Sequence, residues 1–141
     1  MKQLLARPRL TLAAWLGFLG FVALLTHVPL PPGGASRIPH LDKIAHFGSY
    51  FVLALLGAVR LAAYERILHT RKLVLWGVFY ALYGVIDELT QPWTGRTADV
   101  DDWLADAFGI AAATWFAFIW LRRTRLSEPG EGVATDDAAG E

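Results

Sequence analysis

Four stretches of the chain are almost wholly apolar, and polar residues flank each of them. They cover residues 10–26, 44–59, 73–86 and 107–121. None contains Asp, Glu, Lys or Arg, and only His46 interrupts the second. Apolar runs of this length between charged segments predict hydrophobic helices. We therefore expect an all-α fold, an integral membrane four-helix bundle.

The first apolar stretch has a basic start, as a secretory signal peptide also has. The apolar centre of a signal peptide usually spans about 7–15 residues and is followed by a small-x-small cleavage site. No clean site of that kind closes residues 10–26. This stretch therefore predicts a retained transmembrane helix.

Residues 127–141 differ from the rest in composition, being small, acidic and free of aromatic side chains. Such a segment cannot bury enough apolar surface to offset the entropy lost on ordering. The expected organisation is a four-helix transmembrane domain over residues 1–126 and a disordered acidic cytoplasmic tail over residues 127–141.

Composition narrows the function classes. The 141 residues are 55% hydrophobic and 18% charged, whereas soluble domains carry about 25% charged residues. The zero net charge removes any general argument for binding nucleic acid. The lack of cysteine excludes disulfides, thiolate zinc sites and a cysteine nucleophile. No phosphate-binding loop, serine-nucleophile elbow or zinc-protease helix motif occurs, which argues against a classical hydrolase or a nucleotide-driven pump.

The third and fourth stretches are too short to span a bilayer by themselves. Their fourteen and fifteen residues rise about 21–23 Å, against a hydrocarbon core of about 30 Å. Polar residues must fill the missing length, and all lie at the same end of the bundle. They are Asp42, Lys43 and His46 on the second helix, Asp87, Glu88 and Gln91 on the third, and Asp102 and Asp106 on the fourth.

The spacing of these polar residues predicts that they converge. Residues three, four and seven apart share a helix face, and a charge facing lipid costs about 2.5–3.5 kcal/mol. Three stripes result: Asp42, His46, Ser49, Tyr50 and Leu53; Tyr80, Tyr83, Gly84, Asp87 and Gln91; and Asp99, Asp102, Asp106, Gly109 and Ala113. We expect the side chains of His46, Asp87, Arg96, Asp102 and Asp106 to form one cluster near the outer surface.

The candidate site residues admit more than one role. His46 suits a proton shuttle, a metal ligand or a hydrogen bond that fixes helix register. Arg96 suits a clamp on a phosphate or carboxylate, or an ion pair with Asp99 or Glu88. The full set of polar candidates is Asp42, Lys43, His46, Tyr50, Asp87, Glu88, Gln91, Arg96, Asp99, Asp102 and Asp106.

Acidic residues outnumber basic ones in this region. Seven carboxylates (Asp42, Asp87, Glu88, Asp99, Asp101, Asp102 and Asp106) face only two cations, Lys43 and Arg96. Adjacent carboxylates in a low-dielectric site repel unless a proton, a base or a cation offsets them. Either some are protonated, or a divalent cation is bound, with Asp87, Glu88, Asp102 and Asp106 as candidate ligands. A purely structural salt network is the alternative.

Three ordered motifs in this region resemble those of the VanZ-like membrane proteins, a family named for an accessory teicoplanin-resistance protein. They are Asp42-Lys43-x-x-His46-Phe47-x-x-Tyr50, Asp87-Glu88-x-x-Gln91, and Arg96-x-x-Asp99-x-x-Asp102-x-x-Ala105-Asp106-x-x-Gly109. The resemblance covers residues 10–121 and implies an integral membrane protein of about four helices. Some members of this family are associated with reduced glycopeptide susceptibility. The resemblance does not imply any particular reaction. This chain departs at Asp106, where the family commonly has Asn.

The preferred functional hypothesis is binding of a cell-envelope lipid or a peptidoglycan precursor by an outward acidic cluster with His46 and Arg96. The first alternative is a membrane enzyme in which a cation assists phosphoester or amide chemistry and His46 is the general base. The second is a structural or assembly protein whose network only holds the bundle together. No catalytic residue is assigned beyond these roles, membrane lipid is the expected partner, and the oligomeric state stays open.

The distribution of Lys and Arg predicts the topology in the plasma membrane. Ten lie before the first helix, between the second and third, and after the fourth, against three in the other two loops. Cytoplasmic loops retain basic residues, so both termini are expected in the cytoplasm. Reporter fusions after Leu126 and within residues 29–41 will test this, and an extracytoplasmic C-terminus would contradict it.

Overall fold

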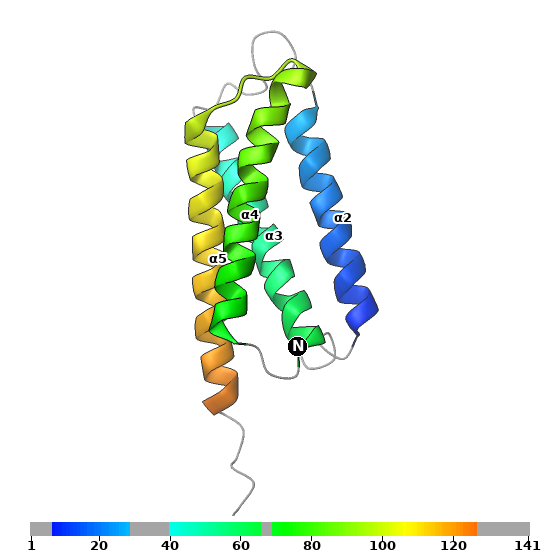
Figure 1. The fold of residues 1–141 in the computed structure, drawn as a ribbon, viewed down its shortest axis with the longest axis vertical. Helices are drawn as coiled ribbons and strands as arrows, with labels where there is room; N and C mark the ends of the chain where they lie inside the picture. The colour runs from blue at the N-terminus through cyan, green and yellow to red at the C-terminus, as the bar shows by residue number, and fades with distance from the viewer. Residues whose placement is uncertain (1–6, 29–39, 66–68, 127–141) are drawn as a thin grey trace, which may run out of the picture.

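A computed structural model describes residues 7–28, 40–65 and 69–126, and these residues form an antiparallel helical bundle (Figure 1). In chain order the elements are α2 (Pro8–His27), α3 (Leu41–Tyr64), α4 (Thr70–Thr90), the 3₁₀ helix η1 (Gln91–Thr94) and α5 (Val100–Leu126). Within these ranges there is no strand, and the all-α expectation is confirmed. The expected disordered tail, residues 127–141, lies outside the described residues.

Each helix is longer than its apolar stretch because the polar residues next to that stretch are helical too. α3 begins before Asp42, α4 continues through Asp87 and Glu88, and α5 begins before Asp102. Gln91, expected on the third helix, instead opens η1. All four α-helices are long and apolar enough to cross a membrane. The polar residues therefore complete the spans, as the short apolar runs predict.

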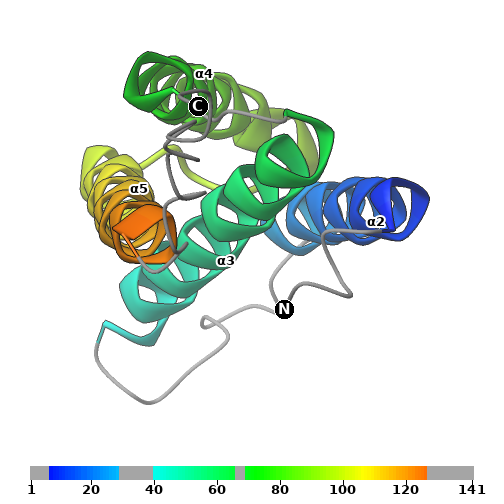
Figure 2. The same cartoon turned by 90° about the horizontal axis from the view of Figure 1, so that it is seen from below.

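The helices run alternately up and down, so their ends meet in two groups (Figure 1). Seen along the bundle, α3 lies between α2 and α5, and α4 packs against α5 (Figure 2). The end at which α2 and α4 finish and α3 and α5 begin is called the polar end below. η1 and the connection from α4 to α5 cross this end (Figure 1).

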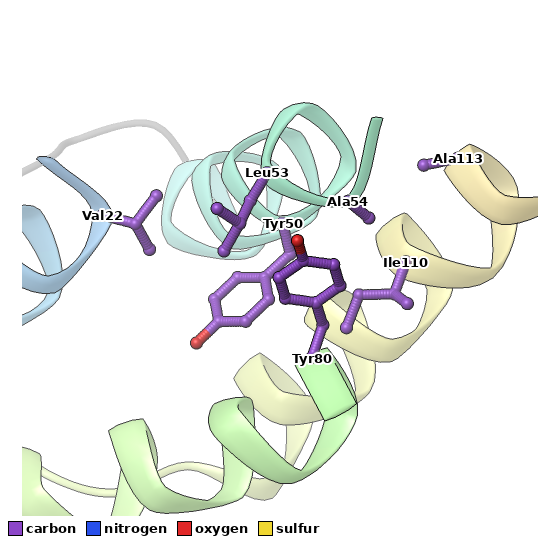
Figure 3. Packing of buried hydrophobic residues seen from close by; sticks show 7 residues of the cluster. All are labelled: Val22, Tyr50, Leu53, Ala54, Tyr80, Ile110 and Ala113. Carbon is purple, nitrogen blue, oxygen red and sulfur yellow. The ribbon is translucent and has the colours of Figure 1, made fainter. Parts of the chain in front are cut away.

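The apolar core draws on all four helices (Figure 3). Its buried members are Val22, Tyr50, Leu53, Ala54, Tyr80, Ile110 and Ala113. Trp15 Nε1 donates a hydrogen bond of 2.7 Å to the hydroxyl of Tyr80, which ties α2 to α4 through the core. Large apolar side chains such as Leu24, Ile86 and Phe108 are exposed. An apolar exterior around a packed interior fits a bundle whose solvent is lipid.

Gly109 sets the closest approach of α5 to α3. A Cβ atom at this position would meet the carbonyl oxygen of Phe47 and lie 3.1 Å from the backbone nitrogen of Phe51. Small residues at transmembrane helix contacts allow backbones to approach in this way. The distance between the polar side chains of α3 and α5 therefore depends on glycine at residue 109.

We expect Gly109→Ala to lower the stability of the bundle, because the added methyl group pushes α5 away from the α3 backbone. Overpacking of this kind costs about 1–3 kcal/mol. Gly48→Ala on α3 is the matched control, since a Cβ there meets nothing within 4 Å. Thermal unfolding in detergent measures both variants. Equal melting temperatures would contradict the role given to Gly109.

Candidate functional site

The polar end of the bundle encloses seven polar side chains that are almost inaccessible. Their exposed fractions range from 0% to 6%, for Thr26, His46, Asp87, Glu88, Gln91, Asp102 and Asp106. They come from all four α-helices and from η1, and five of them lie on the stripes that the sequence predicts to face one another: His46, Asp87, Gln91, Asp102 and Asp106. Burial in a membrane bundle requires each of these groups to find a partner inside the protein.

His46 stands at the centre of one group of residues, which we call the histidine cluster: His46, Glu88, Asp102 and Asp106. Its Nδ1 is 3.0 Å from Asp106 Oδ1, within hydrogen-bond distance. The same Nδ1 is 3.9 Å from Glu88 Oε1, and Nε2 is 3.8 Å from Asp102 Oδ2. One imidazole therefore meets carboxylates from both α4 and α5.

Glu88 is held by two hydrogen bonds that also fix the connection between α4 and α5. Its Oε1 accepts from Gln91 Nε2 at 2.8 Å, and its Oε2 accepts from the backbone N–H of Asp99 at 2.9 Å. The first bond ties the Glu88 carboxylate to η1, and the second ties it to the backbone just before α5 begins. Glu88 is therefore preorganised toward His46.

Lys43 neutralises the carboxylates near the start of α5. Its Nζ donates to Asp102 Oδ1 at 2.9 Å and to Asp99 Oδ2 at 3.0 Å. Asp99 Oδ1 in turn accepts the N–H of Asp101 at 2.9 Å, which caps the start of α5. This backbone hydrogen bond, followed by the one from Lys43, lowers the pKa of Asp99 below its ordinary value. Asp42 is exposed, with Oδ2 4.0 Å from Lys43 Nζ, and lies outside the buried group.

Asp87 belongs to a second group that faces α2. Its Oδ1 accepts from Thr26 Oγ1 at 2.9 Å and lies 3.6 Å from His27 Nδ1. Consecutive residues point about 100° apart around a helix, so Asp87 and Glu88 take different partners. This separation relieves the repulsion that their adjacency in sequence predicts. Thr26 and His27 are not among the site residues predicted from the sequence, although these two polar residues close an otherwise apolar stretch.

Three buried oxygen atoms have no hydrogen-bond partner among the described residues. They are the hydroxyl of Tyr50, Oδ2 of Asp87 and Oδ2 of Asp106. The Tyr50 hydroxyl lies beside Asp87, so these two groups can serve as donor and acceptor to each other. Buried polar atoms are nearly always paired in proteins, so Asp106 Oδ2 is the oxygen that keeps unused capacity to accept a hydrogen bond.

Arg96 does not join the buried cluster, contrary to the expected convergence. Its Nη1 donates a long hydrogen bond of 3.4 Å to the carbonyl oxygen of Leu25 at the end of α2. Within the described ranges it forms an ion pair with neither Asp99 nor Glu88. The short connection before α5 directs its side chain across the polar end. His46, Asp87, Asp102 and Asp106 are all buried there, and a ligand-binding role for any of these residues stays a prediction.

We expect Asp106→Asn to leave the protein folded and at least as stable, because the amide oxygen of Asn can still accept from His46 Nδ1. Asp106→Ala is the matched comparison, since it leaves that buried N–H without a partner at a cost of about 1–3 kcal/mol. Thermal unfolding in detergent will separate the two variants. If Asp106→Asn destabilises as much as Asp106→Ala, the carboxylate charge itself is required for folding.

Comparison with known proteins agrees with the motifs that form this site. The family model described as VanZ/LLP1 matches residues 7–121, which include all four helices up to the last turns of α5. No curated protein and no solved structure gives a match. Because the family model covers most of the chain, this protein is a member of the VanZ/LLP1 family.

Proposed function

We propose that this membrane protein binds the polar headgroup of a cell-envelope lipid or a peptidoglycan-related lipid at its polar end. The single observation that carries the proposal is the buried Oδ2 of Asp106, which has no hydrogen-bond partner among the described residues. An unsatisfied polar atom in a bundle interior costs free energy. A ligand that supplies donors would recover that free energy on binding.

The charge of the site indicates which ligands it favours. Around the histidine cluster, Lys43 is the one Lys or Arg paired with its carboxylates in the described part of the chain. The remaining acidic excess favours a headgroup that brings an amine or a bound cation. Arg96 lies at the edge of the polar end, and among the described residues its side chain makes one long hydrogen bond. Its guanidinium is suited to the phosphate of the same headgroup.

The proposal includes an orientation. With both termini in the cytoplasm, as the distribution of Lys and Arg predicts, the polar end would lie at the outer leaflet of the plasma membrane, where envelope precursors are exposed. Binding there would connect the protein to glycopeptide susceptibility, since those drugs act on the outer face. The competing reading is structural, in which the polar groups only hold α2, α3, α4 and α5 together.

Lipid mass spectrometry on gently purified protein tests the proposal, with Asp87→Asn as the main variant. We expect a bound envelope lipid that is reduced roughly tenfold, equivalent to about 1.4 kcal/mol, in Asp87→Asn and in Glu88→Gln. Both variants should still insert into the membrane and elute as folded protein. A growth or drug-susceptibility assay on the same strains then reports whether function is lost with the lipid.

Asp101→Asn is the matched control, because Asp101 is an exposed carboxylate on the same helix as Asp102. It should keep both the lipid and the phenotype. If Asp87→Asn merely unfolds the protein, the structural reading is correct. If all variants retain the same lipids as the unmodified protein, the polar end is not the binding site.

A further inference from the structure

We infer that the histidine cluster is a divalent cation site, with His46, Glu88 and Asp102 as ligands and Asp106 as a positioning residue. One potential ligand atom from each of His46, Glu88 and Asp102 lies within 4.8 Å of the other two. All three side chains are buried, and they come from three different helices. This set differs from the four carboxylates that the sequence suggests, because Asp87 turns toward α2, Asp106 contacts His46 Nδ1, and His46 joins the remaining two.

Asp106 favours the tautomer of His46 that leaves Nε2 able to bind a metal. When Asp106 is ionised, its carboxylate can only accept a hydrogen bond, and Nδ1 then carries the proton in the 3.0 Å contact with Asp106 Oδ1. Nε2 then has a free lone pair. Metal-binding imidazoles almost always donate their second nitrogen to a carboxylate, a carbonyl or water, which fixes the tautomer and raises the basicity of the ligand nitrogen.

A second observation points to a ligand between these residues. His46 Nε2 makes no hydrogen bond to any described residue, and this nitrogen keeps some accessible surface within a side chain that is 5% exposed. The nearest carboxylate oxygen recorded for it, Asp102 Oδ2, is 3.8 Å away, beyond hydrogen-bond distance. Ligand atoms around a tetrahedral cation with bonds of about 2.0–2.1 Å lie roughly 3.3 Å apart. A cation at Nε2 therefore needs Asp102 Oδ2 to move closer, and it needs Glu88, whose Oε1 lies 3.9 Å from Nδ1, to turn toward Nε2.

The other two ligands have the capacity to bind a cation without losing their present partners. Glu88 uses one lone pair of Oε1 for Gln91 and one of Oε2 for Asp99, and each carboxylate oxygen has two. Asp102 uses Oδ1 for Lys43, which leaves Oδ2 for the site. The hydrogen bonds from Gln91, Asp99 and Lys43 would then hold both carboxylates in a fixed orientation toward the cation.

The donor set indicates the class of cation. Imidazole nitrogen favours first-row transition metals, whereas a site made of oxygens alone favours Mg²⁺ or Ca²⁺. One nitrogen and two carboxylates suit Zn²⁺ or Mn²⁺. The two positive charges would also offset carboxylates that Lys43 leaves unneutralised. A cation would attract the phosphate of a headgroup that the acidic cluster alone repels, and this last consequence rests on the proposed lipid binding.

Metal binding to the purified, chelator-treated protein in detergent tests the site directly. We expect Zn²⁺ or Mn²⁺ alone to bind with one ion per chain and to raise the melting temperature, since a ligand that binds only the folded state stabilises it. Affinity should fall at least tenfold in Asp102→Asn and in Glu88→Gln. X-ray absorption on the Zn²⁺-loaded protein without substitution should show one imidazole in the coordination shell. This last measurement does not depend on whether any variant folds.

Asp101→Asn is the control for charge alone, and it should bind the metal as the unmodified protein does. Asp106→Asn should bind about 10-fold more weakly, because its amide keeps the tautomer of His46 but loses the negative charge. Binding that is absent, or an imidazole-free shell, or equal affinity in Asp101→Asn and Asp102→Asn would overturn the cation site. If the unmodified protein binds the metal but carries no envelope lipid, only the proposed function is overturned.

Discussion

The contact between His46 on α3 and Asp106 on α5 is the interaction on which the polar end depends. Both side chains are essentially buried, and their atoms are 3.0 Å apart in the interior of a bundle built for lipid. Neither group could be placed there alone, because an unpaired polar group at membrane depth costs several kcal/mol. The contact therefore fixes the rotation of α5 about α3, and the other polar contacts follow from that rotation.

Apolar packing and polar pairing depend on each other at this contact. Gly109 lies three residues after Asp106, on the same face of α5, and its missing side chain lets α5 approach the backbone beside Phe47. Phe47 follows His46 directly in the chain. A larger residue at 109 would separate the helices at the level where the imidazole and the carboxylate meet. Gly109 and the His46–Asp106 pair therefore act together in bringing α3 and α5 close to each other.

The remaining contacts extend from this centre in two directions. Toward the start of α5, Glu88, Asp99 and Lys43 secure the chain that links α4 to α5. Toward α2, Asp87 binds Thr26 and approaches His27. Each helix therefore contributes at least one polar group to the same end. The bundle accommodates the carboxylates of this end by distributing them among several partners. Within the described residues, Asp106 Oδ2 is buried without a hydrogen-bond partner.

The sequence by itself determined the number of helices, their approximate limits and the faces that turn inward. Apolar runs of this length indicate helices directly. The 3.6-residue period of the α-helix predicted that His46, Asp87, Asp102 and Asp106 lie on buried stripes. Partners were decided only by the tertiary structure. Adjacent Asp87 and Glu88 serve different helices, Thr26 and His27 enter the site from α2, and Arg96 turns to Leu25. Periodicity gives the direction of a side chain from its own helix axis, but the atom that it meets depends on how the helices are rotated and how closely they approach.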